Sequence, residues 1–172
     1  MRHTVLLKSR LSLAASATAL LVLTGCASQV PLESKSAAPT TSAADAAAKA
    51  EASRIAAAKA ELAKVKPSVY FDFDKFDIKP GYQATVTAFA NYLKADTKAR
   101  LLIEGNADER GTTEYNLALG QKRAEAVSKA LGVLGIAANR VESISNGEEK
   151  PRVKGANEAA WAENRRADLI IK

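Results

Sequence analysis

Residues 101–124, LLIEGNADERGTTEYNLALGQKRA, change within one segment from the period of a strand to the period of a helix. The apolar start predicts a short strand that ends near Gly105. The polar loop 106–111 follows, and either Thr112 or Thr113 can cap the next helix, because a threonine hydroxyl accepts hydrogen bonds from free backbone N–H groups. A strand, a loop and a helix in this order predict a helix that packs back on a sheet.

The helix after this loop is predicted because apolar and small residues recur there at helical spacing. The members of this narrow stripe are Leu117, Gly120, Ala124, Val127 and Leu131. Gly132 and Gly135 can end the helix, since glycine readily adopts the backbone conformation of a helix C-terminus. Arg123 and Asn116 would lie on one flank, where Arg123 at the margin of the buried face can extend its guanidinium over the edge.

The remainder of residues 67–172 adds further strands and helices. Residues 69–74 alternate between apolar and polar, which predicts a strand, and residues 80–95 have the spacing of an amphipathic helix. The other predicted elements are a strand at 141–145, a short helix around 157–161 and a strand at 167–171. The resulting β-α-β-α-β-α-β order predicts an α+β or α/β two-layer sandwich in which helices cover one sheet.

Residues 1–25 have the pattern of a signal peptide, with a positively charged start, the apolar run 11–23 and a small-residue exit. The run is shorter than the roughly 20 residues that a membrane-spanning helix needs. The tetrapeptide LTGC ending at Cys26 resembles the bacterial lipobox, in which the cysteine receives a diacylglyceryl group; a chance cysteine near a cleavage site is the alternative. Because Cys26 is the only cysteine, no internal disulfide can form. Ala27 after it implies sorting to the outer membrane, with the folded domain facing the periplasm.

Residues 26–66 are predicted to be a spacer between the lipidated cysteine and the domain. Residues 27–42 are small and polar without aromatic side chains, which is typical of a flexible tether. The alanine-rich residues 43–66 predict a helix of roughly 35 Å. Ile55 and Leu62 are seven residues apart, so a weak self-association seam is an alternative to a single spacer helix.

Composition argues against an enzyme. The only histidine, His3, lies in the signal peptide and the only cysteine lies at the lipidation site, which removes histidine triads, thiol nucleophiles and most transition-metal sites. A glycosidase pair could come from Asp72, Asp74, Asp108 and Glu109. Asp72 and Asp74, however, fall on one face of a predicted strand and fit a solvated face equally well. We therefore expect a protein without catalytic activity.

The net charge does not indicate a nucleic-acid-binding protein. The formal charge of +6 falls to about +3 once Arg2, Lys8 and Arg10 leave with the signal peptide. Nucleic-acid binding would require basic residues clustered on one face, whereas here they are interspersed with aspartate and glutamate.

The loop 106–111 is the candidate binding site, since ligands gather where strands end and helices begin. Glycines at both ends let the backbone turn sharply, and the free N–H groups at the helix start form a small anion site. Asp108 and Arg123 can hold opposite ends of a zwitterion, because a carboxylate binds ammonium and a guanidinium binds carboxylate. The alternatives are a turn aspartate that bonds its own backbone and a surface arginine paired with Glu125.

Four segments together resemble the OmpA-like C-terminal domain family, and within it the lipoproteins that associate with peptidoglycan. They are 70–74 (YFDFD), 105–111 (GNADERG), 115–124 (YNLALGQKRA) and 161–167 (WAENRRA). The resemblance covers roughly residues 68–172 and implies an α+β fold with helices packed on a mixed sheet. Ala107 stands where many members have threonine, which leaves Asp108 and Arg123 untouched.

The resemblance implies a ligand, the meso-diaminopimelate of the peptidoglycan stem peptide, and no cofactor or metal. Asp108 would accept from an ammonium group and Arg123 would hold a carboxylate. The same pocket would be lined by Phe73, Asp74, Asn116, Leu119 and Arg165. Alternatively, residues 164–166 form a structural corner with one arginine paired to Asp72 or Glu104.

The resemblance also implies partners: TolB and, through it, the other Tol components that draw the envelope inward at cell division. The expected function is a non-catalytic tether between the outer membrane and the cell wall. An envelope assembly or stress lipoprotein that acts mainly through protein–protein contact is the alternative, and a wall hydrolase is a third interpretation.

Overall fold

The computed structural model describes the backbone of residues 40–172 and the side chains from Ser42 onward. The predicted signal peptide, Cys26 and most of the predicted tether lie outside the described residues. The elements in chain order are α1 (Thr40–Leu62), β1 (Ser68–Tyr70), the 3-10 turn η1 (Pro80–Tyr82), α2 (Gln83–Ala95), β2 (Leu101–Asn106), α3 (Thr113–Val133), the 3-10 turn η2 (Ala138–Arg140), β3 (Val141–Gly147), α4 (Glu158–Asn164) and β4 (Arg166–Ile171). From β1 onward this is the predicted β-α-β-α-β-α-β order.

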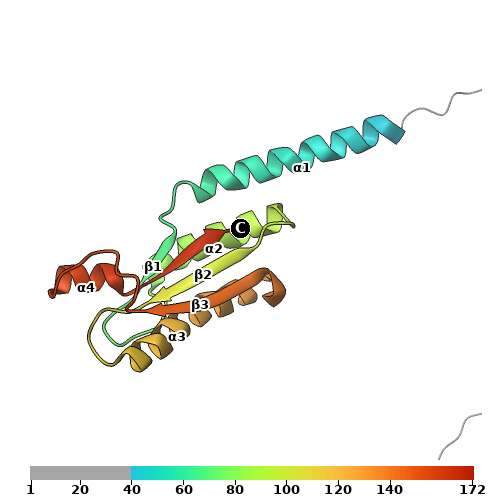
Figure 1. The fold of residues 1–172 in the computed structure, drawn as a ribbon. Coiled ribbons are helices and arrows are strands. Elements are labelled where there is room, and N and C mark those ends of the chain that lie inside the picture. Colours follow the sequence, from blue (N-terminus) through green and yellow to red (C-terminus); the bar gives the residue numbers. More distant parts are fainter. Residues whose placement is uncertain (1–39) are drawn as a thin grey trace, which may run out of the picture. The chain divides into compact units, whose positions relative to one another are not determined.

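The four strands form one mixed sheet in the order β1-β4-β2-β3. β2 and β3 are parallel, whereas β4 runs antiparallel to both of its neighbours, β1 and β2. Helices α2 and α3 cover one face of this sheet, and α4 lies at the end where β2 leads into the loop before α3 (Figure 1). The predicted α+β two-layer fold with helices on a mixed sheet is therefore confirmed.

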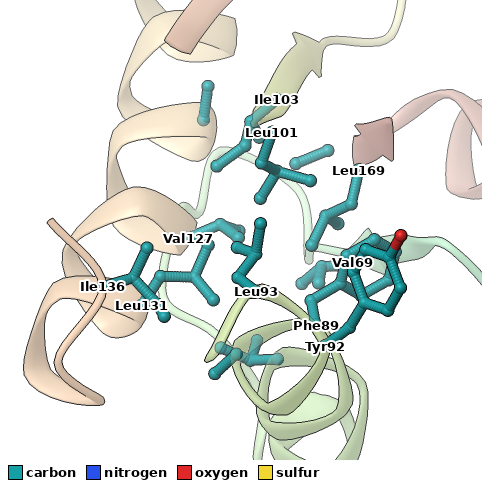
Figure 2. Packing of buried hydrophobic residues seen from close by; sticks show 14 of the residues in the cluster. Val69, Phe89, Tyr92, Leu93, Leu101, Ile103, Val127, Leu131, Ile136 and Leu169 are labelled. Carbon is teal, nitrogen blue, oxygen red and sulfur yellow. The ribbon is translucent and has the colours of Figure 1, made fainter. Parts of the chain in front are cut away.

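The hydrophobic core lies between the sheet and the two long helices of the domain (Figure 2). Leu101 and Ile103 of β2 point toward Leu93 of α2 and Val127 and Leu131 of α3, and all five are at most 1% exposed. Fully burying each such side chain stabilises the fold by about 1.5–3 kcal/mol. This core fixes where the loops at the sheet end lie.

Helix α3 approaches the sheet so closely at one point that only glycines fit. A Cβ atom added to Gly105 of β2 would lie 2.6 Å from the carbonyl carbon of Gly120 in α3 and would overlap the carbonyl oxygen. A Cβ atom on Gly120 would in turn overlap the hydroxyl of Ser145 on β3. This contact joins the end of β2 to the first half of α3, and so positions the loop between them.

The buried face of α3 differs from the predicted stripe at its N-terminal end. Gly120, Ala124, Val127 and Leu131 are buried as predicted, but Leu117 is 40% exposed. The first turns of the helix extend past the core, and Leu117 packs on the backbone of Gly147 at the end of β3. The end of α3 agrees with the prediction, since the helix stops at Val133 before Gly135, whose φ is +88°.

The first strand is shorter than predicted. β1 ends at Tyr70, and the chain leaves the sheet in a turn in which the N–H of Lys75 donates to the carbonyl of Asp72 at 3.1 Å. Asp74 has a positive φ of 55° in this turn. The prediction that Asp72 and Asp74 share a strand face is therefore wrong, and Phe73 is turned outward and 56% exposed.

Helix α1 spans Thr40–Leu62, rather than the predicted 43–66. Ile55, Ala58 and Leu62 are partly buried against the core of the domain. The two residues considered as a self-association seam thus contact the chain's own domain. Among residues 40–172, no helix is long and apolar enough to cross a membrane.

Candidate functional site

A cleft of about 270 Å³ lies at the sheet end, between the 72–75 turn, the loop after β2 and the start of α3. Its lining residues are Phe73, Asp74, Asp108, Arg110, Gly111, Tyr115, Asn116 and Leu119. Five of the seven predicted pocket residues are in this set, and the other two, Arg123 and Arg165, lie behind it. The structure therefore brings together residues that the sequence separates widely.

Two larger grooves among the described residues have a different character. The larger of these two, about 730 Å³, runs between Phe76 and the exposed side of α3 and is open to solvent at Val133. The second, about 620 Å³, lies between β1, the start of α2 and α4. Neither is lined by Asp108. The second groove is lined by the buried Arg165, but among the described residues only the 270 Å³ cleft is lined by a buried carboxylate, that of Asp108, and this carboxylate marks it as the candidate site.

Asp108 is the acidic centre of the cleft and is only 4% exposed. Its Oδ1 accepts from the backbone N–H of Arg110 at 3.1 Å and from Arg110 Nε at 3.0 Å, and its Oδ2 accepts from Arg110 Nη2 at 2.7 Å. Arg165 Nη1 also donates to Oδ2 at 3.4 Å. The alternative interpretation of a turn aspartate thus holds for one hydrogen bond, while the others involve side-chain cations.

These cations keep Asp108 charged despite its burial. Burial by itself would raise the pKa of this carboxyl, but the hydrogen bonds and the charge of Arg110, with a smaller contribution from Arg165, leave the pKa below its ordinary value. At neutral pH the cleft therefore presents a carboxylate.

Asp108→Asn is expected to reduce the acid sensitivity of the fold. A carboxyl whose pKa is lowered by folding stabilises the protein above the unfolded pKa, and this contribution is lost as the pH falls through the folded pKa. For Asp108 the loss should begin near 3.8 and continue below it. Thermal unfolding of the wild type and of Asp108→Asn should be measured between about pH 2 and pH 6. The difference between their Tm values should be constant near pH 6 and should become smaller as the pH falls toward 2. A difference that does not change with pH would contradict this expectation.

Arg123 is fully buried beneath the cleft, so the predicted placement at the margin of the buried face is wrong. Its guanidinium donates to three backbone carbonyls: Nε to Lys75 at 2.9 Å, Nη1 to Asn106 at 2.8 Å and Nη2 to Asp72 at 3.2 Å. The alternative pairing with Glu125 is also wrong, because Glu125 accepts from Gln121 instead. Arg123 therefore ties the 72–75 turn to the end of β2.

The charge of Arg123 still acts on the cleft. Burial lowers the pKa of Arg123 to about 10, and the largest opposing influence is the charge of the Asp108 carboxylate, which raises the pKa. The group is thus protonated at neutral pH. Three of its five N–H groups donate to the carbonyls described above, which leaves two for a further acceptor.

Arg165 contacts Asp108 of the cleft, whereas Arg166 does not. Arg165 is buried behind the cleft, where it donates to the carbonyl of Phe71 at 3.2 Å and to Glu158 at 2.5 Å, besides Asp108. Arg166 is bonded to Asp168 at 2.8 Å, away from the cleft. Neither arginine pairs with Asp72 or Glu104, so that part of the structural-corner alternative is wrong.

Asp72 and Glu104 have lysine partners instead. Lys79 lies 2.6 Å from Asp72, and Lys150 lies 3.5 Å from Glu104.

The remaining predicted residues are held by partners that the sequence did not reveal. The Nδ2 of Asn116 donates to the carboxylate of Glu148 in the loop after β3, and the hydroxyl of Tyr115 donates to Asp74. Thr112 caps α3 as predicted, since its hydroxyl accepts from the N–H of Tyr115 at 3.2 Å. The hydrogen bonds to Asp74 and Glu148 connect the start of α3 to the 72–75 turn and to the loop after β3.

Arg110 lines the cleft and was not among the residues predicted from the sequence. Its guanidinium lies 4.1 Å from the ring centre of Phe73 and 4.1 Å from that of Trp161, so it lies against two aromatic side chains. Because Arg110 follows Asp108 by two residues, the ion pair between their side chains could have been predicted from the sequence. The two rings come from distant segments, and no local pattern could have placed them there.

The described residues contain no cluster of three or more histidine, cysteine, aspartate or glutamate side chains arranged to hold a metal ion. The cleft combines the carboxylates of Asp108 and Asp74, guanidinium groups beside and beneath Asp108, and apolar surface from Leu119 and Phe73. Such a site suits a small zwitterion with a short aliphatic chain.

The fold and the cleft agree with a known class of domain. The model of the OmpA family matches residues 70–165, and the chain belongs to this family. Its relatives include proteins named peptidoglycan-associated lipoprotein. The one from Haemophilus influenzae is 53% identical over 102 residues, which are 59% of this chain and 67% of the relative. The one from Pseudomonas putida is 45% identical over 100 residues, which are 58% of this chain and 60% of the relative.

A solved structure gives the same result. The peptidoglycan-associated lipoprotein from Burkholderia pseudomallei matches with a TM-score of 0.61 and 55% sequence identity, over 62% of this chain and 91% of that chain. The OmpA-like domain of FopA1 from Francisella tularensis has a TM-score of 0.52 at 22% identity and shows the shared fold alone. The resemblance inferred from the four sequence segments is thereby confirmed.

Proposed function

We propose that this protein is an outer-membrane lipoprotein that binds peptidoglycan non-covalently and tethers the outer membrane to the cell wall. In this proposal residues 1–25 are the signal peptide, Cys26 bears the lipid, residues 26–66 are the spacer and residues 67–172 bind the wall from the periplasmic side. Support comes from the lipobox-like sequence, from relatives with this name and from a cleft suited to a charged peptide. No catalytic step is part of the function.

The proposed ligand is the meso-diaminopimelate side chain of the stem peptide, which has an ammonium and a carboxylate at its free end. The observation on which this rests is a charged Asp108, nearly buried yet lining an open cleft. Asp108 would accept from the ammonium group, and Leu119 and Phe73 would contact the methylene groups. The carboxylate would be attracted by the guanidinium of Arg123 and by the backbone N–H groups at the start of α3.

Arg123 acts in this proposal mainly by position. Its side chain holds the turn that contains Asp74 and the strand end that leads to Asp108, while its buried positive charge attracts the ligand carboxylate from beneath the cleft. Asn116 and Arg165 keep the walls of the cleft in place, through Glu148 and through Glu158.

We also propose that the protein works with TolB and the other Tol components in envelope integrity and in constriction of the outer membrane at cell division. This part rests on the names of the relatives and not on a surface of this chain. If wall binding failed, the alternative of an assembly lipoprotein acting through protein contacts would take its place.

Cosedimentation with isolated cell-wall sacculi tests the proposed function. Residues 38–172, which form one compact unit, are expected to pellet with sacculi. Asp108→Asn should weaken binding by about 10-fold or more, because a hydrogen bond to a charged group contributes about 1.5–3 kcal/mol. Asp45→Asn, which removes the same charge from an exposed position of α1, is the matched control and should pellet like the wild type. Equal pelleting of Asp108→Asn and wild type would refute the assignment of the site.

A further inference from the structure

The guanidinium of Arg110 occupies a complete binding site for a cation. Asp108 contacts it through two parallel hydrogen bonds, at 3.0 Å and 2.7 Å. The guanidinium also lies over the rings of Phe73 and Trp161, each with its ring centre 4.1 Å away. A carboxylate together with aromatic faces is the chemistry that recognises ammonium and guanidinium groups in general.

The walls of this site come from three separate segments of the chain. Phe73 belongs to the turn after β1, Asp108 to the loop after β2, and Trp161 to α4. The indole of Trp161 is oriented by its own hydrogen bond, from Nε1 to Glu109 at 3.1 Å. Asp108 in turn keeps Arg165 as a second partner. The geometry of the site therefore does not depend on Arg110 alone.

A second acidic partner lies near the guanidinium of Arg110. Its Nη1 lies 3.9 Å from Glu158, whose side chain is 65% exposed at the edge of the cleft. The side chain of Arg110 is itself 31% exposed, whereas that of Asp108 is 5% exposed. A rotation of the arginine side chain toward solvent would uncover the carboxylate and still leave the guanidinium near an acidic partner.

The proposed ligand needs the same carboxylate oxygens that Arg110 uses. Each carboxylate oxygen of Asp108 already accepts two hydrogen bonds, and three of the four come from Arg110. Because a carboxylate has about four acceptor positions, a stem-peptide ammonium finds none free until the side chain of Arg110 moves. We propose that Arg110 is an internal competitor, which fills the cation subsite of Asp108, Phe73 and Trp161 in the free domain and is displaced by the ammonium group of the wall peptide. This inference rests on the proposed function and assigns a regulatory role to a residue inside its site.

Removing the competitor should tighten binding. The apparent affinity of a site that is open in only a fraction of molecules is reduced by that fraction. If the open form makes up about a tenth of the population, Arg110→Gln should bind a soluble diaminopimelate muropeptide about 10-fold more tightly than the wild type. The matched control is Arg54→Gln, which removes the same charge from an exposed position of α1 and should leave the affinity unchanged.

Trp161 reports the displacement directly, because it is the only tryptophan in the chain. Calorimetry and tryptophan fluorescence would be recorded on the purified full chain, with the muropeptide as titrant. We expect the emission of the wild type to change as the muropeptide binds, since the indole loses its stacked guanidinium. Arg110→Gln should show altered emission before any ligand is added, together with the tighter binding.

The outcomes separate this inference from the function on which it rests. If the wild type binds but Arg110→Gln binds more weakly, Arg110 assists the ligand and the inference is overturned while the function stands. If the wild type binds without any change in Trp161 emission, Arg110 stays in place and the inference is again overturned. If neither protein binds, the proposed function fails and the inference fails with it.

Discussion

Gly105→Ala is expected to lower the free energy of unfolding by about 3 kcal/mol or more, toward the upper end of the cost of overpacking a core. The added methyl group would lie 2.6 Å from the carbonyl carbon of Gly120 and would overlap its oxygen. The obstacle is helix backbone and not a flexible side chain, so α3 would have to move away from β2. That movement would also displace the loop that contains Asp108.

Urea denaturation followed by circular dichroism would measure the effect, with Gly132→Ala as the matched control. Gly132 lies in the same helix, but a Cβ atom there would meet nothing within 4 Å. This control should stabilise the protein by about 0.5–1 kcal/mol, because alanine is the better helix former. If Gly105→Ala and Gly132→Ala were equally stable, the close approach of helix and strand would be disproved.

Arg123→Met is expected to cost about 3 kcal/mol of stability or more and to abolish wall binding at the same time. The substitution removes the shared donor of the carbonyls of Asp72, Lys75 and Asn106. The carbonyl of Asn106 is buried, and an unsatisfied buried acceptor costs about 1–3 kcal/mol, to which the two partly buried carbonyls of the turn add. Arg123→Lys should be only a partial replacement, because a single ammonium group lacks the planar fork that reaches all three acceptors.

Arg140→Met is the control that separates stability from binding. Arg140 also donates to three backbone carbonyls, those of Leu93, Asp96 and Ala99. It lies in η2, directly before β3, at the end of the sheet opposite the cleft. Both variants should have a lowered midpoint in thermal melting. At a temperature where both are folded, only Arg123→Met should fail to cosediment with sacculi. An Arg123→Met protein that melts like the wild type would contradict the buried-clamp description.

Most of the fold could be predicted because local periodicity and hydrophobic burial agree. The strand at Leu101 and Ile103, the helix ended by Gly135 and the threonine cap all follow from short-range patterns that the structure retains. The strand predicted through Phe73 failed for a physical reason. The chain leaves the sheet after Tyr70 in a turn whose carbonyls are bound by Arg123, from a helix that comes much later in the sequence.

The sequence was sufficient to predict which residues belong to the candidate site, but not how their side chains interact. Asp108 and Leu119 could be named because they lie in segments that match a family pattern, and the structure places both in the cleft. The burial of Arg123 could not be derived, since helical spacing alone does not show whether a flanking arginine has backbone acceptors within reach. The placement of Arg110 against Phe73 and Trp161 requires the loop after β2, the turn after β1 and α4 to meet, which only tertiary packing determines.

An NMR titration of isotope-labelled protein with a soluble diaminopimelate muropeptide tests the central claim most directly. The account predicts that the largest shift changes occur at the backbone amides of Asp108, Arg110, Asn116 and Leu119, and that Asp108→Asn removes them. Shift changes concentrated instead along the groove between Phe76 and Val133 would contradict it, because wall binding would then use a different surface.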